Sequence, residues 1–327
     1  MKPKMNRKEK IIYQMNQLGL QGKSFAFLID FKAEKPQLFD LKKSSNEIFW
    51  QVPMHTNCKP KKNNTSIKKW QILPVSLKRY EAGYNIIHQH ILNGDTYLLN
   101  YTQPTTIDTN LQPEDIFSIS NAPYKIFLKN RFVCFSPETF IKIRNGKIYS
   151  SPMKGTIDAN VKNAKKIILN DSKELAEHNT IVDLIRNDLS LVAENVVVDK
   201  FRFIDHIRTN QRDLLQVSSV ISGNLPKDYQ RNIGNIIFTL LPAGSVTGAP
   251  KKKTVEIINK VEKYNRGYYT GIFGIFDGKN LDSCVLIRYI EIEENKLVYK
   301  SGGGITHLSN VASEYDEMIK KVYVPVT

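Results

Sequence analysis

The chain has 327 residues, of which 41% are hydrophobic and 24% are charged, and this globular composition excludes a largely disordered protein. Lys and Arg number 47 against 32 Asp and Glu, so the formal net charge is +15. No apolar run approaches the roughly 18 residues of a membrane span, which excludes an integral helical membrane protein. Three widely separated cysteines, Cys58, Cys134 and Cys284, predict neither a disulfide framework nor a zinc site. We therefore expect a cytoplasmic protein.

In chain order, the first predicted element is a buried strand at residues 24–31. Apolar residues at helical spacing then predict a helix at residues 77–92, and a turn leads into a strand at 96–106. Residues 125–150 alternate strand-like runs with turns, and Asn145-Gly146 has the composition of a hairpin turn.

The second half of the chain predicts two helices within residues 160–188, a strand at 218–222 and a helix at 226–240. Another helix is expected directly after Pro250. The last predicted elements are strands at 269–276, 283–292 and 296–300, a glycine-rich turn and a helix near 311–322. Hairpins interleaved with helices indicate an α+β protein with largely antiparallel sheets, and we expect one domain over residues 1–327.

Basic charge is concentrated near the start of the chain. Residues 1–70 hold 15 Lys and Arg against 5 Asp and Glu, and include the clusters Lys59-Pro60-Lys61-Lys62 and Lys68-Lys69. Such clusters can contact nucleic-acid phosphates, but no nucleic-acid-binding motif or aromatic–basic repeat accompanies them. A solvated basic surface is therefore the favoured interpretation, and a nucleic-acid partner is not expected.

Two pairs of acidic residues have a spacing that places both carboxylates on one helix face. Glu174 and Glu177 lie in one predicted helix, and Glu314 and Glu317 repeat the spacing in the last one. Solvated surface is the ordinary explanation for a single such pair. Because two such pairs occur, each beside a turn rich in small residues, the alternative is that the carboxylates bind a divalent cation. Carboxylate oxygens are hard ligands, which favour Mg²⁺.

Further candidate residues point to an anionic, carboxylated ligand. Residues 242–250 and 301–304 are glycine-rich turns, and the first leads into a helix whose N-terminus can attract an anion. Lys154 follows a predicted strand, and its amine would become nucleophilic if desolvated or placed near other cations. Arg288 lies in the predicted apolar strand 283–292, where it needs either a structural ion pair or a ligand carboxylate.

Nine ordered motifs together resemble the chorismate-utilising enzymes, and most nearly component I of the aminodeoxychorismate synthases. The motifs are Gly94-Asp95-Thr96-Tyr97, Ser136-Pro137-Glu138-Thr139-Phe140, Pro152-Met153-Lys154-Gly155-Thr156, KELAEHNTIVDLIRND at 173–188, GSVTGAPK at 244–251, RGYYTGIFG at 266–274, Ile287-Arg288, SGGGI at 301–305 and SEYDE at 313–317. The resemblance implies two large facing antiparallel sheets with helices outside and the active site between them. It covers a catalytic core at residues 77–323, preceded by a short basic part at 1–76.

The resemblance also implies a set of ligand-binding residues. Glu177 and Glu317 would bind Mg²⁺, supported through water by Glu174 and Glu314. The cation would hold the ring carboxylate of chorismate. Residues expected to contact the substrate directly are Arg288, Tyr269, Gly303, Gly304, Lys321, Gln216, Ser245 and Thr247. Gln216 stands where the family commonly has His, and an amide cannot carry a proton at neutral pH.

Lys154 distinguishes the activities within this family. Aminodeoxychorismate synthases resemble this chain in having a lysine at the position of Lys154. The resemblance implies that this lysine attacks C2 of the ring and that Glu138 protonates the departing C4 hydroxyl. Anthranilate synthases carry Ala at this position and are the second candidate. Isochorismate and salicylate synthases use a lysine in the strand after the Gly-Asp turn, where this chain has Leu98-Leu99, and they rank third.

The resemblance finally implies partners. No G-x-C-x-G glutaminase motif occurs in the chain, so ammonia is expected from a separate glutamine amidotransferase subunit. Aminodeoxychorismate lyase would use the product, in the route to p-aminobenzoate and folate. The competing hypothesis from another class is a basic binder of nucleic acid or an anionic surface on a catalytically silent scaffold.

Overall fold

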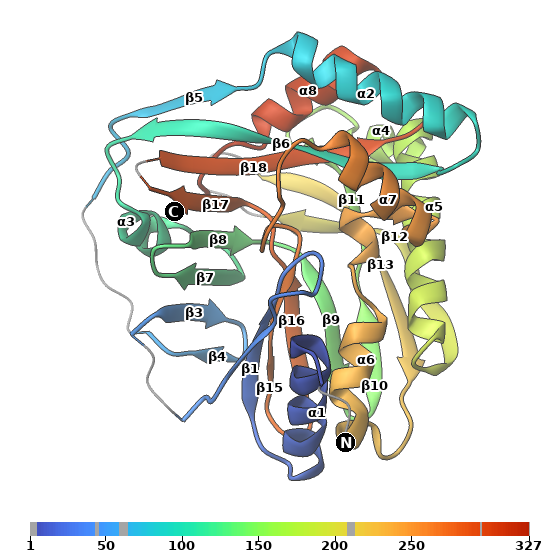
Figure 1. Ribbon diagram of the computed structural model, residues 1–327. Helices are drawn as coiled ribbons and strands as arrows, with labels where there is room; N and C mark the ends of the chain where they lie inside the picture. The colour runs from blue at the N-terminus through green and yellow to red at the C-terminus, as the bar shows by residue number, and fades with distance from the viewer. Residues whose placement is uncertain (1–4, 43–45, 59–64, 208–212, 295, 327) are drawn as a thin grey trace. The chain divides into compact units, whose positions relative to one another are not determined.

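The computed structural model describes residues 5–42, 46–58, 65–207, 213–294 and 296–326 (Figure 1). Backbone contacts group the chain into two compact units, each assembled from three stretches. Unit 1 comprises Met1–Lys43, Thr139–Ser245 and Thr270–Val285, and unit 2 comprises Ser44–Glu138, Val246–Tyr269 and Leu286–Thr327. Each unit therefore requires distant parts of the chain to meet, and the prediction of one domain over residues 1–327 stays a prediction.

Unit 1 is built on a nine-stranded antiparallel sheet with the order β11-β13-β10-β9-β16-β15-β1-β2, in which β12 also pairs with β13. Its strands are β1 (Phe25–Ile29), β2 (Gln37–Phe39), β9 (Thr139–Arg144), β10 (Lys147–Ser150), β11 (Met153–Asp158), β12 (Glu194–Ile207), β13 (Leu214–Asn224), β15 (Ile272–Phe276) and β16 (Leu281–Val285). Its helical segments are α1 (Arg7–Leu20), α4 (Ala164–Asn170), α5 (Ser172–Ser190), η1 (Tyr229–Asn232) and α6 (Ile233–Thr239). The short turn η2 (Gly244–Val246) lies where the chain passes into unit 2.

Local sequence explains several of these elements. Every residue of β1 is buried, as its continuous apolar run predicts. Asn145 and Gly146 join β9 to β10 with φ values of 52° and 78°, and two successive positive φ values are typical of a type I′ hairpin. The helix α5 begins after Asp171, whose side chain accepts a hydrogen bond from the Glu174 amide.

Unit 2 is built on a second nine-stranded antiparallel sheet with the order β14-β6-β18-β17-β8-β7-β3-β4, in which β5 also pairs with β6. Its strands are β3 (Ile48–Val52), β4 (His55–Thr56), β5 (Trp70–Pro74), β6 (Leu98–Thr109), β7 (Tyr124–Leu128), β8 (Phe132–Ser136), β14 (Gly248–Ala249), β17 (Tyr289–Glu293) and β18 (Lys296–Ile305). Its helices are α2 (Leu77–Leu92), α3 (Pro113–Ile119), α7 (Lys251–Val261) and α8 (Val311–Lys320).

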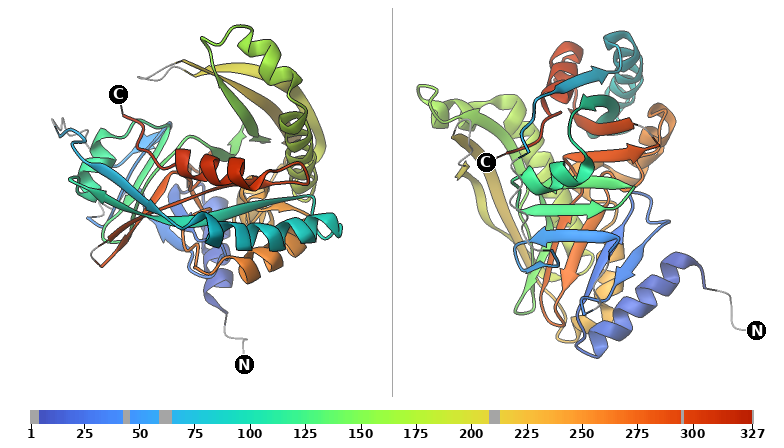
Figure 2. Two further views of the ribbon diagram at one scale, coloured as in Figure 1. Left: turned by 90° about the horizontal axis from the view of Figure 1, so that it is seen from above. Right: turned by 90° about the vertical axis from the view of Figure 1, so that its left-hand side faces the viewer.

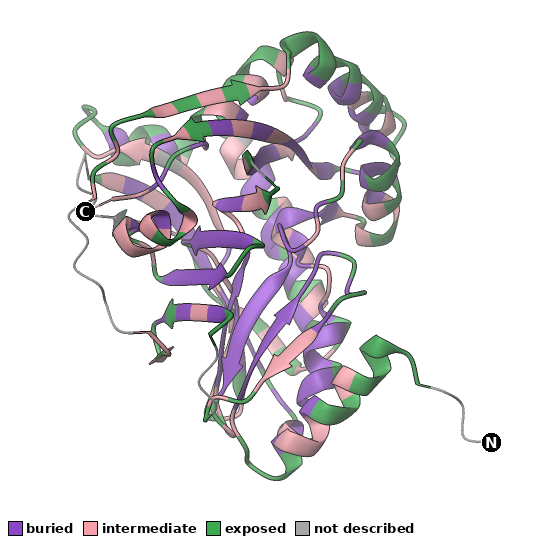
Figure 3. Ribbon diagram, turned by 60° about the vertical axis from the view of Figure 1, so that its left-hand side comes forward, coloured by how far each residue is buried: buried purple, intermediate pink, exposed green. Residues whose placement is uncertain are grey.

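Amphipathic helices cover part of the unit 2 sheet. The predicted helix 77–92 is α2, and its buried residues include the apolar positions that predicted it, Tyr80, Tyr84, Ile87 and Ile91. α2 and α8 lie side by side (Figure 2). Their exposed and buried faces alternate along each helix, whereas the central strands are almost wholly buried (Figure 3).

The structure confirms the predicted fold class, because two large antiparallel sheets with helices account for most of the described residues. Two local predictions were wrong. The strand expected at 283–292 is two strands, β16 and β17, which belong to different sheets and are separated at Arg288, where φ is +53°. The expected glycine-rich turn at 301–304 is extended and forms part of β18.

Close packing requires a glycine at position 302 of β18. A Cβ on Gly302 would lie 2.1 Å from the carbonyl oxygen of Tyr101, so no larger residue fits without a backbone shift. Among the described residues, no helix has both the length and the hydropathy needed to span a membrane. Cys58, Cys134 and Cys284 form no disulfide bond within the described part of the chain. The predicted basic cluster Lys59–Lys62 lies outside the described residues.

Candidate active site

The candidate nucleophile Lys154 lies in unit 1 on β11. Its Nζ is 3.1 Å from Oε2 of Glu177 on α5, and the two side chains are 22% and 7% exposed. The two groups are therefore close enough to form a direct ion pair with a hydrogen bond. The structure therefore brings together the two unit 1 residues that the sequence assigned to nucleophilic attack and to metal binding.

Glu174 lies beside the same residues. A Cβ built on Gly155, which follows Lys154, would lie 3.1 Å from Glu174 Oε2. Gly155 has φ +77° and sits at a bulge in the pairing of β11 with β13, so glycine suits both the backbone conformation and the close approach of the carboxylate. Both carboxylates of this α5 pair therefore lie near β11, one beside Lys154 and the other beside Gly155.

His178 is a member of this group that the sequence reasoning missed. It is 1% exposed, its Nε2 lies 2.6 Å from Ser219 Oγ on β13, and its Nδ1 is buried without a hydrogen-bond partner among the described residues. Burial, followed by the charges of Arg202 and Lys154, lowers its pKa to about 4, so the imidazole is neutral at pH 7. Its position directly after Glu177 in the α5 motif is the signal that could have identified it.

Two further candidates in unit 1 are Gln216 and Ser245, and they differ in how near the structure places them to Lys154. Gln216 on β13 pairs with Thr156, two residues after Lys154. Ser245 follows Gly244, and a Cβ built on Gly244 would lie 2.9 Å from Leu184 Cδ2 and 3.2 Å from Asp188 Oδ2, on later turns of α5. The pairing therefore supports a location for Gln216 near the bulge, whereas Ser245 is carried by the segment that packs farther along the helix.

In unit 2, the second acidic pair lies against the glycines of β18. A Cβ on Gly303 would lie 3.4 Å from Glu317 Oε1 and 3.5 Å from Glu314 Oε2. Glu314 is 1% exposed, whereas the Glu317 side chain is 47% exposed. Burial, followed by the charge of Glu314, raises the pKa of Tyr80 on α2, which places this tyrosine near the same carboxylate.

Lys321 belongs to this unit 2 group. Its Nζ lies 2.6 Å from Glu317 Oε1 and donates to the carbonyl oxygen of Gly302 at 2.8 Å. The hydroxyl of Ser301 donates to the Met318 carbonyl at 2.9 Å, which ties β18 to α8. The structure therefore brings together Glu314, Glu317, Lys321 and the glycines of β18, while Gly304 continues the strand opposite Asn100 of β6.

Arg288, Tyr269 and Glu138 form the other predicted group in unit 2. Arg288 Cζ lies 5.3 Å from the centroid of the Tyr323 ring, and Arg288 Nε is buried without a hydrogen-bond partner among the described residues. Burial raises the pKa of Tyr269, and the charges of Arg288 and Glu138 both act on it. The described residues supply no carboxylate ion pair for Arg288, so the structural ion pair considered from the sequence is not found there.

Thr247 is fully buried in the segment between η2 and β14. Its carbonyl oxygen accepts a hydrogen bond from the Asn100 amide at 2.8 Å. Gly248 follows with φ +134°, and a Cβ there would lie 1.8 Å from the carbonyl oxygen of Leu98. The glycine-rich segment 242–250 is thus held against β6, and it leads into α7 with Pro250 at the N-cap.

Among the described residues, no group of three or more His, Cys, Asp or Glu side chains is arranged to hold a metal ion. The acidic candidates occur instead as two pairs, Glu174 with Glu177 in unit 1 and Glu314 with Glu317 in unit 2. Carboxylate oxygens are the ligand type that Mg²⁺ prefers, so the chemistry of both pairs fits the predicted ion. The magnesium site stays a prediction.

The comparisons with known proteins agree on the family. The sequence profile of the chorismate binding enzymes matches residues 20–327. An uncharacterized PabA-like protein of Haemophilus influenzae is 48% identical over 318 residues, covering 96% of each chain. Anthranilate synthase component 1 of Acetivibrio thermocellus is 31% identical over 255 residues, covering 71% of this chain and 49% of the other.

Aminodeoxychorismate synthase component 1 of Salmonella typhimurium is also 31% identical, over 266 residues that cover 74% of this chain and 56% of the other. The chain thus spans about half the length of these two relatives. Among solved structures, a Bacillus anthracis protein described as a 2,3-dihydroxybenzoate-specific isochorismate synthase superposes with a TM-score of 0.72, at 18% identity and 96% and 86% coverage. That likeness shows the shared fold.

Proposed function

The chain belongs to the chorismate-binding enzyme family, and from this we propose that it is component I of an aminodeoxychorismate synthase, which aminates chorismate at C4 with ammonia. The observation that carries the proposal is Lys154 of β11, whose amine lies 3.1 Å from the Glu177 carboxylate of α5. The relatives that make anthranilate resemble this chain but are expected to have Ala at that position. A lysine there supplies a nucleophile that the anthranilate reaction does not need.

The proposed chemistry is two successive allylic displacements. The neutral amine of Lys154 forms a bond to C2, the two conjugated double bonds of the ring shift toward C4, and the C4–O bond breaks as Glu138 donates a proton to the leaving hydroxyl. Ammonia then forms the C4–N bond, both double bonds shift back and the lysine leaves C2 as a neutral amine, while Glu138 accepts a proton from the added nitrogen. Because only a neutral amine can attack, the Lys154 ammonium, which lies beside Glu177, would first transfer a proton to water.

The substrate carboxylates would be bound by the other predicted residues. Arg288 and Tyr269 would hold the enolpyruvyl carboxylate with the backbone amides of Gly303 and Gly304, and an orphaned buried Arg288 Nε is consistent with an anionic ligand. Gln216, Ser245, Thr247 and Lys321 would complete the contacts to substrate oxygens. A Mg²⁺ held by Glu177 and Glu317, with Glu174 and Glu314 in support, would supply positive charge for the ring carboxylate.

We further propose the partners that this reaction requires. A separate glutamine amidotransferase subunit would supply ammonia, and aminodeoxychorismate lyase would convert the product to p-aminobenzoate for folate synthesis. A cytoplasmic location belongs to the same proposal.

Product identity tests the proposal. Purified protein is incubated with chorismate, Mg²⁺ and ammonium, and aminodeoxychorismate lyase is then added. The proposal expects p-aminobenzoate, formed only when the lyase is present. Anthranilate as the main product, formed without the lyase, would instead support the second candidate, anthranilate synthase component I.

A further inference from the structure

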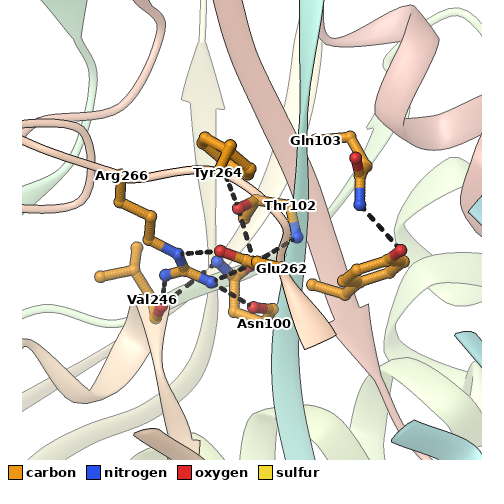
Figure 4. Close-up of polar contacts among 8 residues, drawn as sticks. Asn100, Thr102, Gln103, Val246, Glu262, Tyr264 and Arg266 are labelled. Atoms are coloured by element: carbon orange, nitrogen blue, oxygen red, sulfur yellow. Dashed lines mark hydrogen bonds and ion pairs between the residues drawn. The ribbon is translucent and has the colours of Figure 1, made fainter. Parts of the chain in front are cut away.

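A buried ion pair between Glu262 and Arg266 follows α7 in unit 2 (Figure 4). Arg266 Nε donates to Glu262 Oε2 at 2.8 Å and Nη2 donates to Oε1 at 2.7 Å, so the pairing is bidentate. Glu262 and Arg266 are only 6% and 3% exposed. Removing two charges from water is unfavourable unless their partners compensate, so the contacts that this pair makes decide what it contributes.

The ion pair contacts the backbone of β6. Glu262 Oε1 accepts hydrogen bonds from the Thr102 amide at 2.9 Å and the Thr102 hydroxyl at 2.7 Å, while Arg266 Nη2 donates to the Asn100 carbonyl at 2.7 Å (Figure 4). On this edge of β6, β14 pairs with residues 98–99 and β5 pairs with residues 105–109. The two side chains therefore satisfy the backbone groups between these strands, where the described residues provide no strand partner.

The same guanidinium also holds the glycine-rich segment. Arg266 Nη1 donates to the Val246 carbonyl at 2.9 Å, which also accepts from the Asn100 side-chain amide at 3.2 Å. The Asn100 backbone amide donates to the Thr247 carbonyl at 2.8 Å. Arg266 thus joins β6 to the segment that carries Thr247.

Two further segments meet at this cluster. Lys300 Nζ donates to the carbonyl oxygens of Asn265 and Arg266 at 3.0 and 3.1 Å, and the latter carbonyl also accepts from the Tyr269 amide at 3.1 Å. On its other edge, β6 pairs Asn100 and Thr102 with Gly304 and Gly302 of β18. The cluster therefore supports Thr247, Tyr269 and the β18 glycines, which are the unit 2 segments proposed to contact the substrate.

We propose that Arg266 is a positioning residue for chorismate binding: through Glu262, Val246 and Asn100 it fixes the backbone of the segments that carry the substrate contacts. This inference rests on the proposed function in taking those segments to contact the substrate. Only a guanidinium reaches all of these acceptors, because its donors are spread over a rigid planar fork, whereas lysine has its three donors on one nitrogen. Arg266→Lys keeps the charge and loses the fork, so it separates geometry from electrostatics.

The test measures KM and kcat for chorismate consumption at saturating Mg²⁺ and ammonium. It also measures the shift in melting temperature that chorismate produces without ammonium. Arg266→Lys should raise KM about tenfold or more, reduce kcat by less than about threefold, and shrink the chorismate-induced shift, since charged hydrogen bonds to the binding segments are lost. Asn100→Ala, which removes one of the two side-chain donors to Val246, should raise KM by about threefold.

Ile116→Ala is the matched control for loss of stability alone. Ile116 is fully buried in an apolar cluster with Leu111 and Phe127, and this variant should lower the melting temperature with KM unchanged. If Arg266→Lys and Asn100→Ala lower the melting temperature but keep the parent's KM and chorismate-induced shift, the cluster is merely structural and the inference is overturned. A parent protein that shows neither chorismate consumption nor a chorismate-induced shift would overturn the proposed function itself. Chorismate consumption that gives a different product would leave the inference standing.

Discussion

Buried His178 should make the stability of the protein depend on pH below neutrality. Its pKa is lowered from 6.5 to about 4, chiefly by burial and then by the charges of Arg202 and Lys154. Between these two pH values the unfolded chain binds a proton that the folded chain does not, so stability is full above pH 6.5 and is lost as the pH falls toward 4. A difference of about 2.5 pKa units corresponds to about 3 kcal/mol of unfolding free energy.

The assay is urea unfolding in EDTA-containing buffer from pH 7 to pH 4, comparing the parent protein with His178→Gln. The glutamine keeps a polar partner for Ser219 and does not titrate, so the parent should lose about 3 kcal/mol more than the variant over this range. His206→Gln makes the same change at an exposed histidine of β12 and serves as the matched control. Parallel pH profiles for the parent and His178→Gln would refute the assignment of a buried neutral imidazole.

Two other predictions concern the unit 2 glycines and the acidic pair of α8. Gly302→Ala should lower the unfolding free energy by about 2 kcal/mol or more, because its Cβ would lie 2.1 Å from the Tyr101 carbonyl oxygen. The Cβ of Gly303→Ala would meet nothing closer than 3.4 Å, so this variant should have nearly the unfolding free energy of the parent. Equal losses in urea unfolding would contradict this ranking. Glu317→Gln should raise the Mg²⁺ concentration for half-maximal chorismate consumption by about tenfold or more without lowering the melting temperature. An unchanged Mg²⁺ requirement would remove Glu317 from the proposed ligand set.

Elements with a strong local signal could be predicted from the sequence. The helix α2 has the bounds that its apolar spacing predicted, and the Asn145-Gly146 hairpin has the backbone conformation that its composition predicted. The i, i+3 spacing of the glutamates also placed each acidic pair on one helix, beside Gly155 in unit 1 and Gly303 in unit 2. In these cases residues close in sequence determine the structure.

Predictions that depend on long-range pairing were incomplete or wrong. The apolar run around Arg288 is continuous in sequence, but the chain leaves one sheet there and enters another, and periodicity carries no signal for that change. Residues 301–304 have turn composition, yet β6 packs so closely that only glycine fits the extended strand at Gly302. Local composition cannot report how near a neighbouring strand lies.

The buried polar groups show the same limit. Glu262 and Arg266 are four residues apart and have the appearance of an ordinary surface ion pair, but they are buried against β6, about 160 residues earlier in the chain. His178 was hidden for a similar reason, because its partner Ser219 lies 41 residues away. Sequence motifs identified the segments that hold the candidate residues, whereas the residues that position those segments became visible only in the structure.

The central claim is that the amine of Lys154 is the nucleophile that commits chorismate to amination. The most direct measurement compares the products formed by the parent and by Lys154→Ala from chorismate, ammonium and Mg²⁺, resolved with and without added lyase. The parent should give aminodeoxychorismate, and the variant should lose most of this activity, with anthranilate as its residual product. An undiminished rate of aminodeoxychorismate formation in Lys154→Ala would contradict the claim.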